Sequence, residues 1–359
     1  MERRTATPLA DTISVVIPVH NKVRHVGACL DSVVAAARRH GKVDVVVVDH
    51  QSTDGSRAVV ERHRGAVRIE ELEGGTIAAV RNHGAGLTRG RVISFLDCDC
   101  VIAPDYFLAL ADVLETTRAG AAGCEVDVPT EAHWSEPVWH RLHVIRDDGD
   151  RHYINSANFA VRRDVFDAIG GFDEALVTGE DTDICTRIRS AGFTIFESHR
   201  LRAVHLDNPK SLAAFYRKEV WRGLGAFSGT LRTHTNKATL MVFAHIAFTA
   251  LGMVAIVAAA MVGSWRWLAL AILLMFAAPG ITILYRFAET RRVTNPPAAL
   301  LLYVVYYFAR ANALLRVLAF DRLRGGRGAA PAAGSADRTG SLDPVRRPTA
   351  AQGHGGERS

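Results

Sequence analysis

The sequence predicts an α/β domain of the doubly wound type, followed by helices apolar enough to enter a membrane. Between about residues 11 and 205, short runs of β-branched residues alternate with amphipathic stretches of helical period. Beyond that region, Leu240 to Gly263 and Trp267 to Tyr285 contain no charged residue. Each of these two stretches is long enough to cross roughly 30 Å of hydrocarbon at about 1.5 Å per residue.

The composition agrees with a folded protein of about two structural units. Of 359 residues, 48% are hydrophobic and 22% charged, and the mean hydropathy is +0.08. This excludes disordered, collagen-like and coiled-coil proteins. The five cysteines form no disulfide framework, which favours a reducing compartment. The apolar run Ile13–Val19 is too short for a signal peptide.

The net charge of +6 is compatible with nucleic acid, an anionic membrane surface or a phosphorylated substrate. No basic stripe with interleaved aromatic residues occurs in the globular region, so we do not expect a nucleic-acid partner.

The elements of the α/β domain follow from the pattern in chain order. Continuous apolar runs are typical of strands covered on both faces, as in a parallel sheet. These predict strands at Ile13–Val19, Val43–Val48, Val67–Glu70 and Val92–Leu96. Helices are expected between them, at Val26–Arg39, Ser56–Arg64, Thr76–Leu87 and Tyr106–Thr117.

Polar residues follow the ends of the predicted strands, where ligands bind in doubly wound sheets. Pro18 and His20 end the first strand, and Asp49 directly follows the valines of the second. Asp54 and Ser56 are better explained as caps of the next helix. Asp49 is therefore the stronger ligand candidate in this loop.

Asp97 and Asp99 follow the fourth strand, two residues apart. Residues at i and i+2 point to the same side, so both carboxylates can approach one divalent cation bridging a diphosphate. Hard oxygen ligands favour Mg²⁺ or Mn²⁺. A thiolate site with Cys98 and Cys100 is disfavoured, because no C-x-x-C pair or histidine cluster completes it.

A helix is expected to start near Glu180, with Asp181 and Asp183 in its first turn. Acids there are common complements of the helix dipole, so alone they would indicate no chemistry. His205 follows the last predicted strand and either approaches the metal or diphosphate or has a structural role.

Taken in order, the motifs IPVHN, VVVVDHQSTDGS, AAVRNHGAG, FLDCDC, GGFDE and GEDTDICTRIRSAGF resemble the family 2 glycosyltransferases of the GT-A fold, a Rossmann-like mixed sheet. The resemblance spans about residues 13 to 205. It implies that Asp49 holds the nucleotide base, Arg81 lies near the nucleotide or diphosphate, and Asp97 contacts the ribose. It further implies that Asp99 binds the metal and that Asp181 deprotonates the acceptor.

The chemistry fits these roles: a divalent cation offsets charge on the leaving diphosphate while a carboxylate activates the acceptor on the opposite face, which inverts the anomeric centre. His50 stands where the family often has a second acid, so the nucleotide, UDP or GDP, stays open. The Gln-x-x-Arg-Trp motif of processive synthases is missing, and Lys218–Arg222 resembles it only loosely. We therefore expect the transfer of one sugar and not the synthesis of a polymer. The alternatives are a nucleotide-sugar-binding scaffold without turnover and a nucleotidyltransferase.

The chain is therefore divided into a flexible start (1–10), a catalytic domain (11–208), a basic amphipathic segment (209–238), two transmembrane helices (239–288), a third transmembrane or interfacial helix (297–320) and a disordered tail (325–359). Basic residues flank the apolar stretches, which predicts a multi-pass protein of the cytoplasmic membrane with its catalytic domain in the cytoplasm. The acceptor is expected to be a lipid, a lipid-linked molecule or a glycan.

Overall fold

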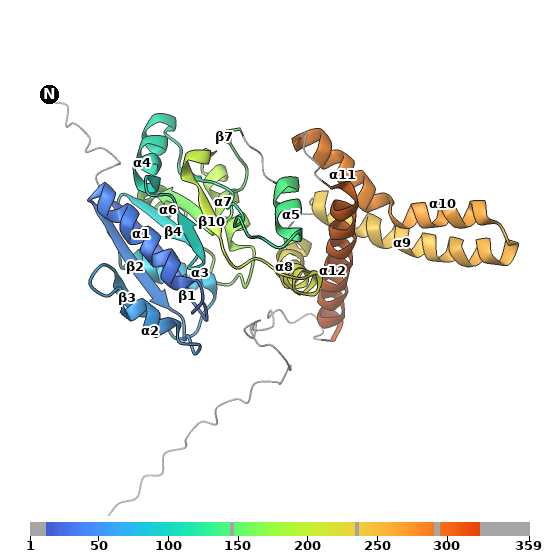
Figure 1. The fold of residues 1–359 in the computed structure, drawn as a ribbon, viewed down its shortest axis with the longest axis horizontal. Helices are drawn as coiled ribbons and strands as arrows, with labels where there is room; N and C mark the ends of the chain where they lie inside the picture. The colour runs from blue at the N-terminus through green and yellow to red at the C-terminus, as the bar shows by residue number, and fades with distance from the viewer. Residues whose placement is uncertain (1–11, 144–146, 234–236, 291–294, 324–359) are drawn as a thin grey trace, which may run out of the picture.

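The computed structural model describes residues 12–143, 147–233, 237–290 and 295–323, which form an α/β domain joined to a group of long helices (Figure 1). The expected flexible start (1–10) and disordered tail (325–359) lie outside the described residues.

The domain is built on a mixed sheet of eight strands in the order β3-β2-β1-β4-β8-β6-β9-β7. The strands are β1 (Ile13–Val19), β2 (Val43–Asp49), β3 (Arg68–Glu71), β4 (Val92–Leu96), β6 (Ala121–Gly123), β7 (Gly149–Asp150), β8 (Asn158–Arg162) and β9 (Ile195–Glu197). The first four are parallel, as predicted, whereas β8 runs antiparallel to both β4 and β6. A separate two-stranded sheet pairs β5 (Cys100–Ile102) with β10 (Ala203–His205).

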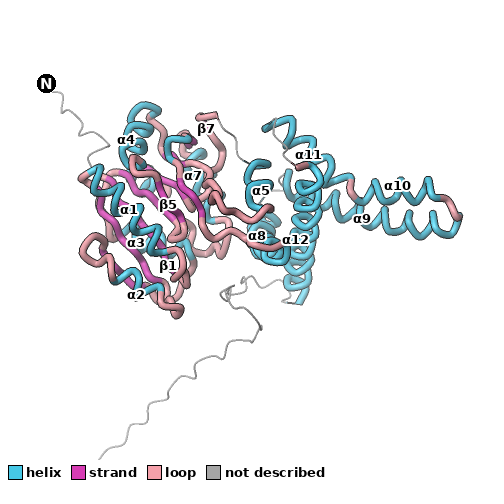
Figure 2. Tube along the Cα trace, viewed as in Figure 1, coloured by secondary structure: helices cyan, strands magenta, loops and turns pink. Residues whose placement is uncertain are grey.

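Helices cover both faces of the large sheet, as the ribbon and tube show (Figure 2). The helices of this part of the chain are α1 (Val26–His40), α2 (Ser56–Glu61), α3 (Ile77–Gly86), α4 (Tyr106–Thr117), α6 (Arg163–Ala168), α7 (Glu180–Ser190) and a short 3₁₀ helix η2 (His199–Leu201). A further helix, α5 (Ser135–His143), packs against the C-terminal helices and not on the sheet. Strand β1 alternates between two cores: Val15 and Ile17 pack with α1 and α4, and Val16 packs with α3, α6 and α7. The predicted α/β class is confirmed.

Gly84 fixes the position of α3 on the sheet. A Cβ at Gly84 would lie 2.4 Å from Cγ1 of Val16 and 3.1 Å from Cγ2 of Val48, so only glycine allows this approach. Arg81 lies one turn earlier on the same helix. The close contact therefore sets how far the Arg81 side chain reaches towards the ends of the strands.

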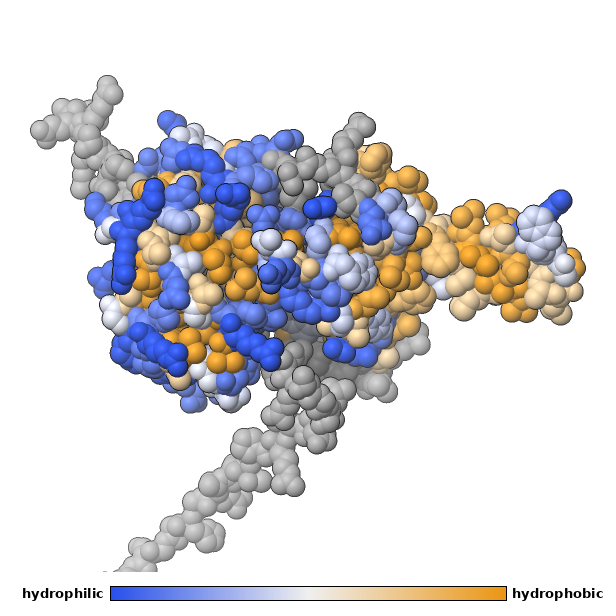
Figure 3. Space-filling model, in the orientation of Figure 1, coloured by the Kyte–Doolittle hydropathy of each residue, from blue (hydrophilic) through white to orange (hydrophobic). Residues whose placement is uncertain are grey.

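The helical region contains α8 (Leu212–Thr233), α9 (Lys237–Val262), α10 (Trp265–Met275), α11 (Ala277–Thr290) and α12 (Pro296–Leu323). Helices α9 and α10 pack as an antiparallel hairpin whose surface is almost wholly apolar (Figure 3). By length and composition, Leu240–Val262 and Pro296–Ala319 are each able to cross a membrane.

The second predicted span differs from expectation. Trp267–Tyr285 is not one straight helix, because α10 and α11 meet at a bend of 55°. Pro279 lies within this stretch, and proline provides no N–H for the carbonyl of Met275 and its ring clashes there. The helix ends at Met275, and α11 restarts two residues before Pro279.

The third predicted segment forms a longer helix than its apolar run indicates. The sequence shows only Ala298–Ala309 before Arg310, yet α12 continues to Leu323. Arg310 is accommodated because its guanidinium bonds Glu219 of α8 at 2.9 Å. Gly223 lets the two helices approach closely, since a Cβ there would lie 2.6 Å from that of Ala313.

Candidate active site

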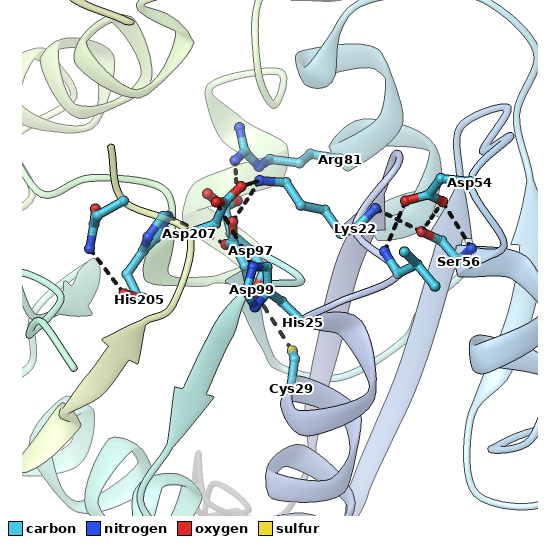
Figure 4. Close-up of polar contacts among 12 residues, drawn as sticks. Lys22, His25, Cys29, Asp54, Ser56, Arg81, Asp97, Asp99, His205 and Asp207 are labelled. Atoms are coloured by element: carbon cyan, nitrogen blue, oxygen red, sulfur yellow. Dashed lines mark hydrogen bonds and ion pairs between the residues drawn. The ribbon is translucent and has the colours of Figure 1, made fainter. Parts of the chain in front are cut away.

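The loops after β1 and β2 are held together by side-chain hydrogen bonds (Figure 4). Asp54 accepts from the backbone N–H groups of Val23 (3.0 Å) and Ser56 (2.9 Å). The hydroxyl oxygen of Ser56 accepts from the N–H of Lys22 at 2.7 Å. Asp54 and Ser56 thus have a structural role, but not as the helix cap expected of them, because the N-cap of α2 is Gly55 and no side chain caps the helix. They fix the loop that carries Lys22.

Asp49 lies at the end of β2 beside Val19 of β1, with its side chain 3% exposed. Its Oδ2 is 3.5 Å from a guanidinium nitrogen of Arg57, and its Oδ1 is buried without a hydrogen bond among the described residues. A buried acceptor without a donor is costly. Asp49 is therefore poised to accept a hydrogen bond from a ligand.

Pro18 and His20, the predicted site residues at the end of β1, have different surroundings from Asp49. Pro18 is buried in β1 opposite Val48. His20 lies in the following loop, with its Nδ1 2.5 Å from the carbonyl oxygen of His50. Burial, followed by the neighbouring His20, lowers the pKa of His50.

Arg81 joins two acids that are far apart in the sequence. Its guanidinium donates to Oδ1 of Asp97 at 2.9 Å and to Oε1 of Glu180 at 2.7 Å. Burial alone would lower the pKa of Arg81, but the two carboxylates raise it overall. This chain of contacts holds the N-terminus of α7, where Asp181 follows Glu180, beside the end of β4.

Asp99 lies at the centre of a second cluster. Its Oδ2 accepts from Nζ of Lys22 at 2.9 Å, and its Oδ1 is 3.4 Å from Nε2 of His205. The ammonium of Lys22 also reaches Oδ2 of Asp207 at 2.5 Å. Burial would raise the pKa of Asp99, but His205 and Lys22 lower it overall.

The surroundings of Asp99 fit a divalent cation. Ligand atoms of Asp99, Cys100 and His205 lie within 4.8 Å of one another, and Asp99 Oδ1 is buried without a hydrogen bond among the described residues. Burial raises the pKa of the Cys100 thiol well above its usual range, so it stays protonated and is a poor ligand. Asp99 and His205 are the remaining donors of this group, and their role as metal ligands stays a prediction.

Asp181 opens α7 and is hydrogen-bonded on both oxygens. Oδ2 accepts from the hydroxyl of Tyr153 at 2.6 Å, and Oδ1 accepts from the N–H of Thr182 at 2.8 Å. Burial, then the charge of Asp181, raises the pKa of Tyr153, so it remains a donor. The Tyr153 hydroxyl thus occupies one place from which an acceptor hydroxyl would bond Asp181.

Helix α8 brings cations towards the same group of acids. Burial, followed by the charge of Arg222, lowers the pKa of Lys218 to about 8, and the charge of Asp99 acts against this shift. No hydrogen bond or ion pair to Lys218 occurs within the ranges that the structure describes. Arg222 lies close enough to Tyr153 and Glu125 for their charges to act on it.

Arg222 and Arg310 share the buried carboxylate of Glu219, and this contact links α8 to α12. Glu219, 2% exposed, accepts from Arg222 at 2.9 Å and from Arg310 at 2.9 Å. Burial would raise the pKa of Glu219, but Arg222 and Arg310 lower it overall. The apolar helices are thus connected to the helix that carries Lys218 into the cleft.

Sequence reasoning missed several residues of this site. The only sign in the sequence that Lys22 and Asp207 belong to the site is that each lies two residues after a predicted site residue, His20 or His205. Tyr153 lies in a loop without periodicity and has none. Lys218 was noticed as part of a basic amphipathic stretch, but nothing in the sequence pointed it at Asp99.

Comparison with known proteins gives the site a family. The sequence profile described as "Glycosyl transferase family 2" matches residues 14–170, which include Asp49, Arg81, Asp97 and Asp99. Residues 14–170 therefore contain a glycosyltransferase family 2 domain. Glycosyltransferase AglE of Haloferax volcanii is 26% identical over 206 residues, 55% of this chain and 67% of AglE. Glycosyltransferase GlyA of Streptococcus pneumoniae is 32% identical over 101 residues, 27% of this chain and only 14% of GlyA.

A solved structure confirms the GT-A architecture. Mannosyltransferase PcManGT from Pyrobaculum calidifontis, solved in complex with GDP-Man and Mn²⁺, aligns with a TM-score of 0.52 and 19% sequence identity over 88% of both chains. The protein therefore has the predicted fold, a mixed α/β sheet followed by candidate membrane helices.

Proposed function

We propose that the protein is an inverting, metal-dependent glycosyltransferase that moves one sugar from a nucleotide-diphosphate sugar to a hydroxyl or phosphate acceptor at a membrane surface. One observation carries the proposal: the Asp97–Arg81–Glu180 chain of contacts brings the α7 acids to the same cleft as Asp97 and Asp99. Residues about 80 positions apart thereby share one site, on the side of the sheet where ligands of such folds bind.

The donor would lie along the ends of β1, β2 and β4. Asp49 Oδ1, buried and without a hydrogen bond among the described residues, suits a base N–H. Asp97 is 32% exposed and oriented by Arg81, which suits a ribose hydroxyl. Pro18 and His20 would border the nucleotide. The family and the PcManGT complex make a nucleotide sugar the expected donor class, with UDP and GDP both open.

The diphosphate would lie near Asp99, His205 and Lys218. A Mg²⁺ or Mn²⁺ ion held by Asp99 and His205 would neutralise charge on the leaving group. Lys218, an ammonium without an ion pair among the described residues, would add a second positive charge beside it. This arrangement favours cleavage of the bond between the sugar and the diphosphate.

Asp181 would act from the other side of the sugar. As general base it would take the proton of an acceptor hydroxyl after the acceptor displaces the Tyr153 hydroxyl from Oδ2. Attack from the face opposite the diphosphate inverts the anomeric centre. A phosphate acceptor needs no deprotonation and would be oriented by Arg222.

The apolar helices would hold this cleft against the membrane. Helices α9 to α11 would enter the bilayer, and α12, tied at its middle to α8 through Arg310 and Glu219, would lie at the interface. The distribution of basic residues favours the cytoplasmic face. A lipid or lipid-linked acceptor is then within reach of the cleft.

The test is a screen of radiolabelled nucleotide sugars against membranes that overproduce the protein, with Mn²⁺ and with chelator. We expect chelator-sensitive transfer of one sugar into the organic phase and an inverted anomeric configuration in the product. Pyrophosphate release would indicate a nucleotidyltransferase. Nucleotide binding without turnover, for every donor tried, would indicate a scaffold and contradict the proposal.

A further inference from the structure

Lys22 occupies a central position between two acids. Its Nζ lies 2.9 Å from Asp99 Oδ2 and 2.5 Å from Asp207 Oδ2 (Figure 4). Asp99 follows the end of β4 and Asp207 follows β10, so two separate segments meet on one ammonium group. The ion pair is largely buried on the Asp99 side, where the carboxylate is 5% exposed.

The backbone around Lys22 is rigidly placed. Its N–H donates to Ser56 Oγ at 2.7 Å, and the Asp54–Ser56 pair fixes that hydroxyl. The groups that face the ammonium from other elements are the ring of His25, 3.9 Å from Asp207, and the ammonium of Lys218 on α8. Lys22 is thus positioned by the fold and is the cation that bonds Asp99 directly.

The same carboxylate is the expected ligand of the divalent ion. A metal ion bound by Asp99 would lie close to the Lys22 ammonium, and like charges at such distances repel each other strongly in a partly buried site. The Lys22 ammonium and the metal ion therefore compete for the carboxylate of Asp99. A second anion, such as the donor diphosphate, would relieve this conflict by pairing with the displaced ammonium.

We propose that Lys22 is a built-in counter-cation of the Asp99–Asp207 pair, which a divalent ion must displace, so that the metal binds tightly only together with the donor diphosphate. The inference rests on the proposed function, because it takes Asp99 as the metal ligand. In the donor-free protein, the ammonium of Lys22 then neutralises the two carboxylates. When the donor binds, the same ammonium pairs with the diphosphate instead.

The experiment measures binding of Mn²⁺ to detergent-purified full-length protein by electron paramagnetic resonance, without turnover. In the absence of nucleotide, the Lys22→Met variant should bind Mn²⁺ about tenfold more tightly than the wild type, because the competing cation is gone. Adding UDP or GDP should raise the Mn²⁺ affinity of the wild type by a larger factor than that of Lys22→Met. The variant Lys22→Arg, which keeps the charge, should resemble the wild type.

Lys42→Met is the matched control, since Lys42 precedes β2 and lies at the opposite end of the strands from Asp49. If Lys22→Met binds Mn²⁺ no more tightly than Lys42→Met, the proposal is overturned. Tight Mn²⁺ binding by the wild type without nucleotide overturns it too, and that measurement needs no variant. Sugar transfer that persists in such a case would leave the proposed function intact, whereas Mn²⁺ binding unaffected by Asp99→Asn would remove the basis of both.

Discussion

Arg81 is the residue on which the geometry of the site depends most. The Arg81→Met variant removes a guanidinium whose side chain is 3% exposed and leaves Asp97 and Glu180 facing each other. Removing one partner of a buried ion pair typically costs about 3–5 kcal/mol. Asp97 is 32% exposed and can be hydrated, whereas Glu180 is 10% exposed. We therefore expect the free energy of unfolding to fall by about 3 kcal/mol.

The assay is thermal unfolding in detergent, followed by tryptophan fluorescence. At roughly 2–4 °C per kcal/mol for a domain of this size, the midpoint should fall by about 6–12 °C at pH 7.5. Burial already raises the pKa of Glu180 in the wild type, while Arg81 acts against that shift. Without Arg81 the carboxyl of Glu180 would gain a proton more readily, so the difference from the wild type should shrink as the pH falls towards 4.5.

Arg64→Met provides the comparison. Arg64 also makes two hydrogen bonds to a carboxylate, that of Glu61 at 2.6 and 2.7 Å, but its side chain is 63% exposed. Its loss should leave the midpoint unchanged, because exposed pairs contribute little. A midpoint for Arg81→Met within 2 °C of the wild type, or a deficit independent of pH, would refute the reasoning.

Three further predictions concern the surroundings of the cleft. Burial, followed by the charge of Glu197, raises the pKa of Glu125 to about 7. Ionisation of Glu125 therefore destabilises the fold as the pH rises from the pKa of Glu125 in the unfolded chain through about 7. Glu125→Gln should therefore raise the unfolding midpoint at pH 8 and leave it unchanged at pH 5, and equal shifts at both would contradict this. Arg310→Met should lower the free energy of unfolding by about 2 kcal/mol, since Glu219 keeps Arg222 as a partner. The variant should also lower turnover, because α8 loses its contact with α12. Full activity at a lowered midpoint would show that this contact has no role in the site. Lys218→Met should raise KM for the donor without lowering the midpoint, because the ammonium it removes has no ion pair among the described residues; a lowered midpoint with unchanged kinetics would make Lys218 structural.

The parallel part of the sheet was predictable because strands β1, β2 and β4 are covered on both faces. The runs of valine and isoleucine in β1, β2 and β4 have no polar face, so their periodicity alone identifies them, and two of the four bounds match residue for residue. Strands β6, β7 and β9 have only two or three residues each, too few to show a pattern, and β6 and β7 consist largely of alanine and glycine.

The contacts between distant segments were not predictable. Arg81 and Glu180 are 99 residues apart, and Lys22 and Asp207 are 185 residues apart, so their pairing depends on how the sheet closes and not on local spacing. The break before Pro279 illustrates the same limit in the helices. Composition identifies an apolar stretch, but the missing N–H of one residue decides whether it stays straight.

The most direct test of the central claim is the rate of sugar transfer by the Asp181→Asn variant, measured alongside its nucleotide binding. We expect transfer to a hydroxyl acceptor to fall by about 10²–10⁴-fold while binding of UDP or GDP with Mn²⁺ is retained. Asp183→Asn, in the same turn of α7 but paired with Arg187, should keep its activity. Transfer by Asp181→Asn at the wild-type rate would contradict the account.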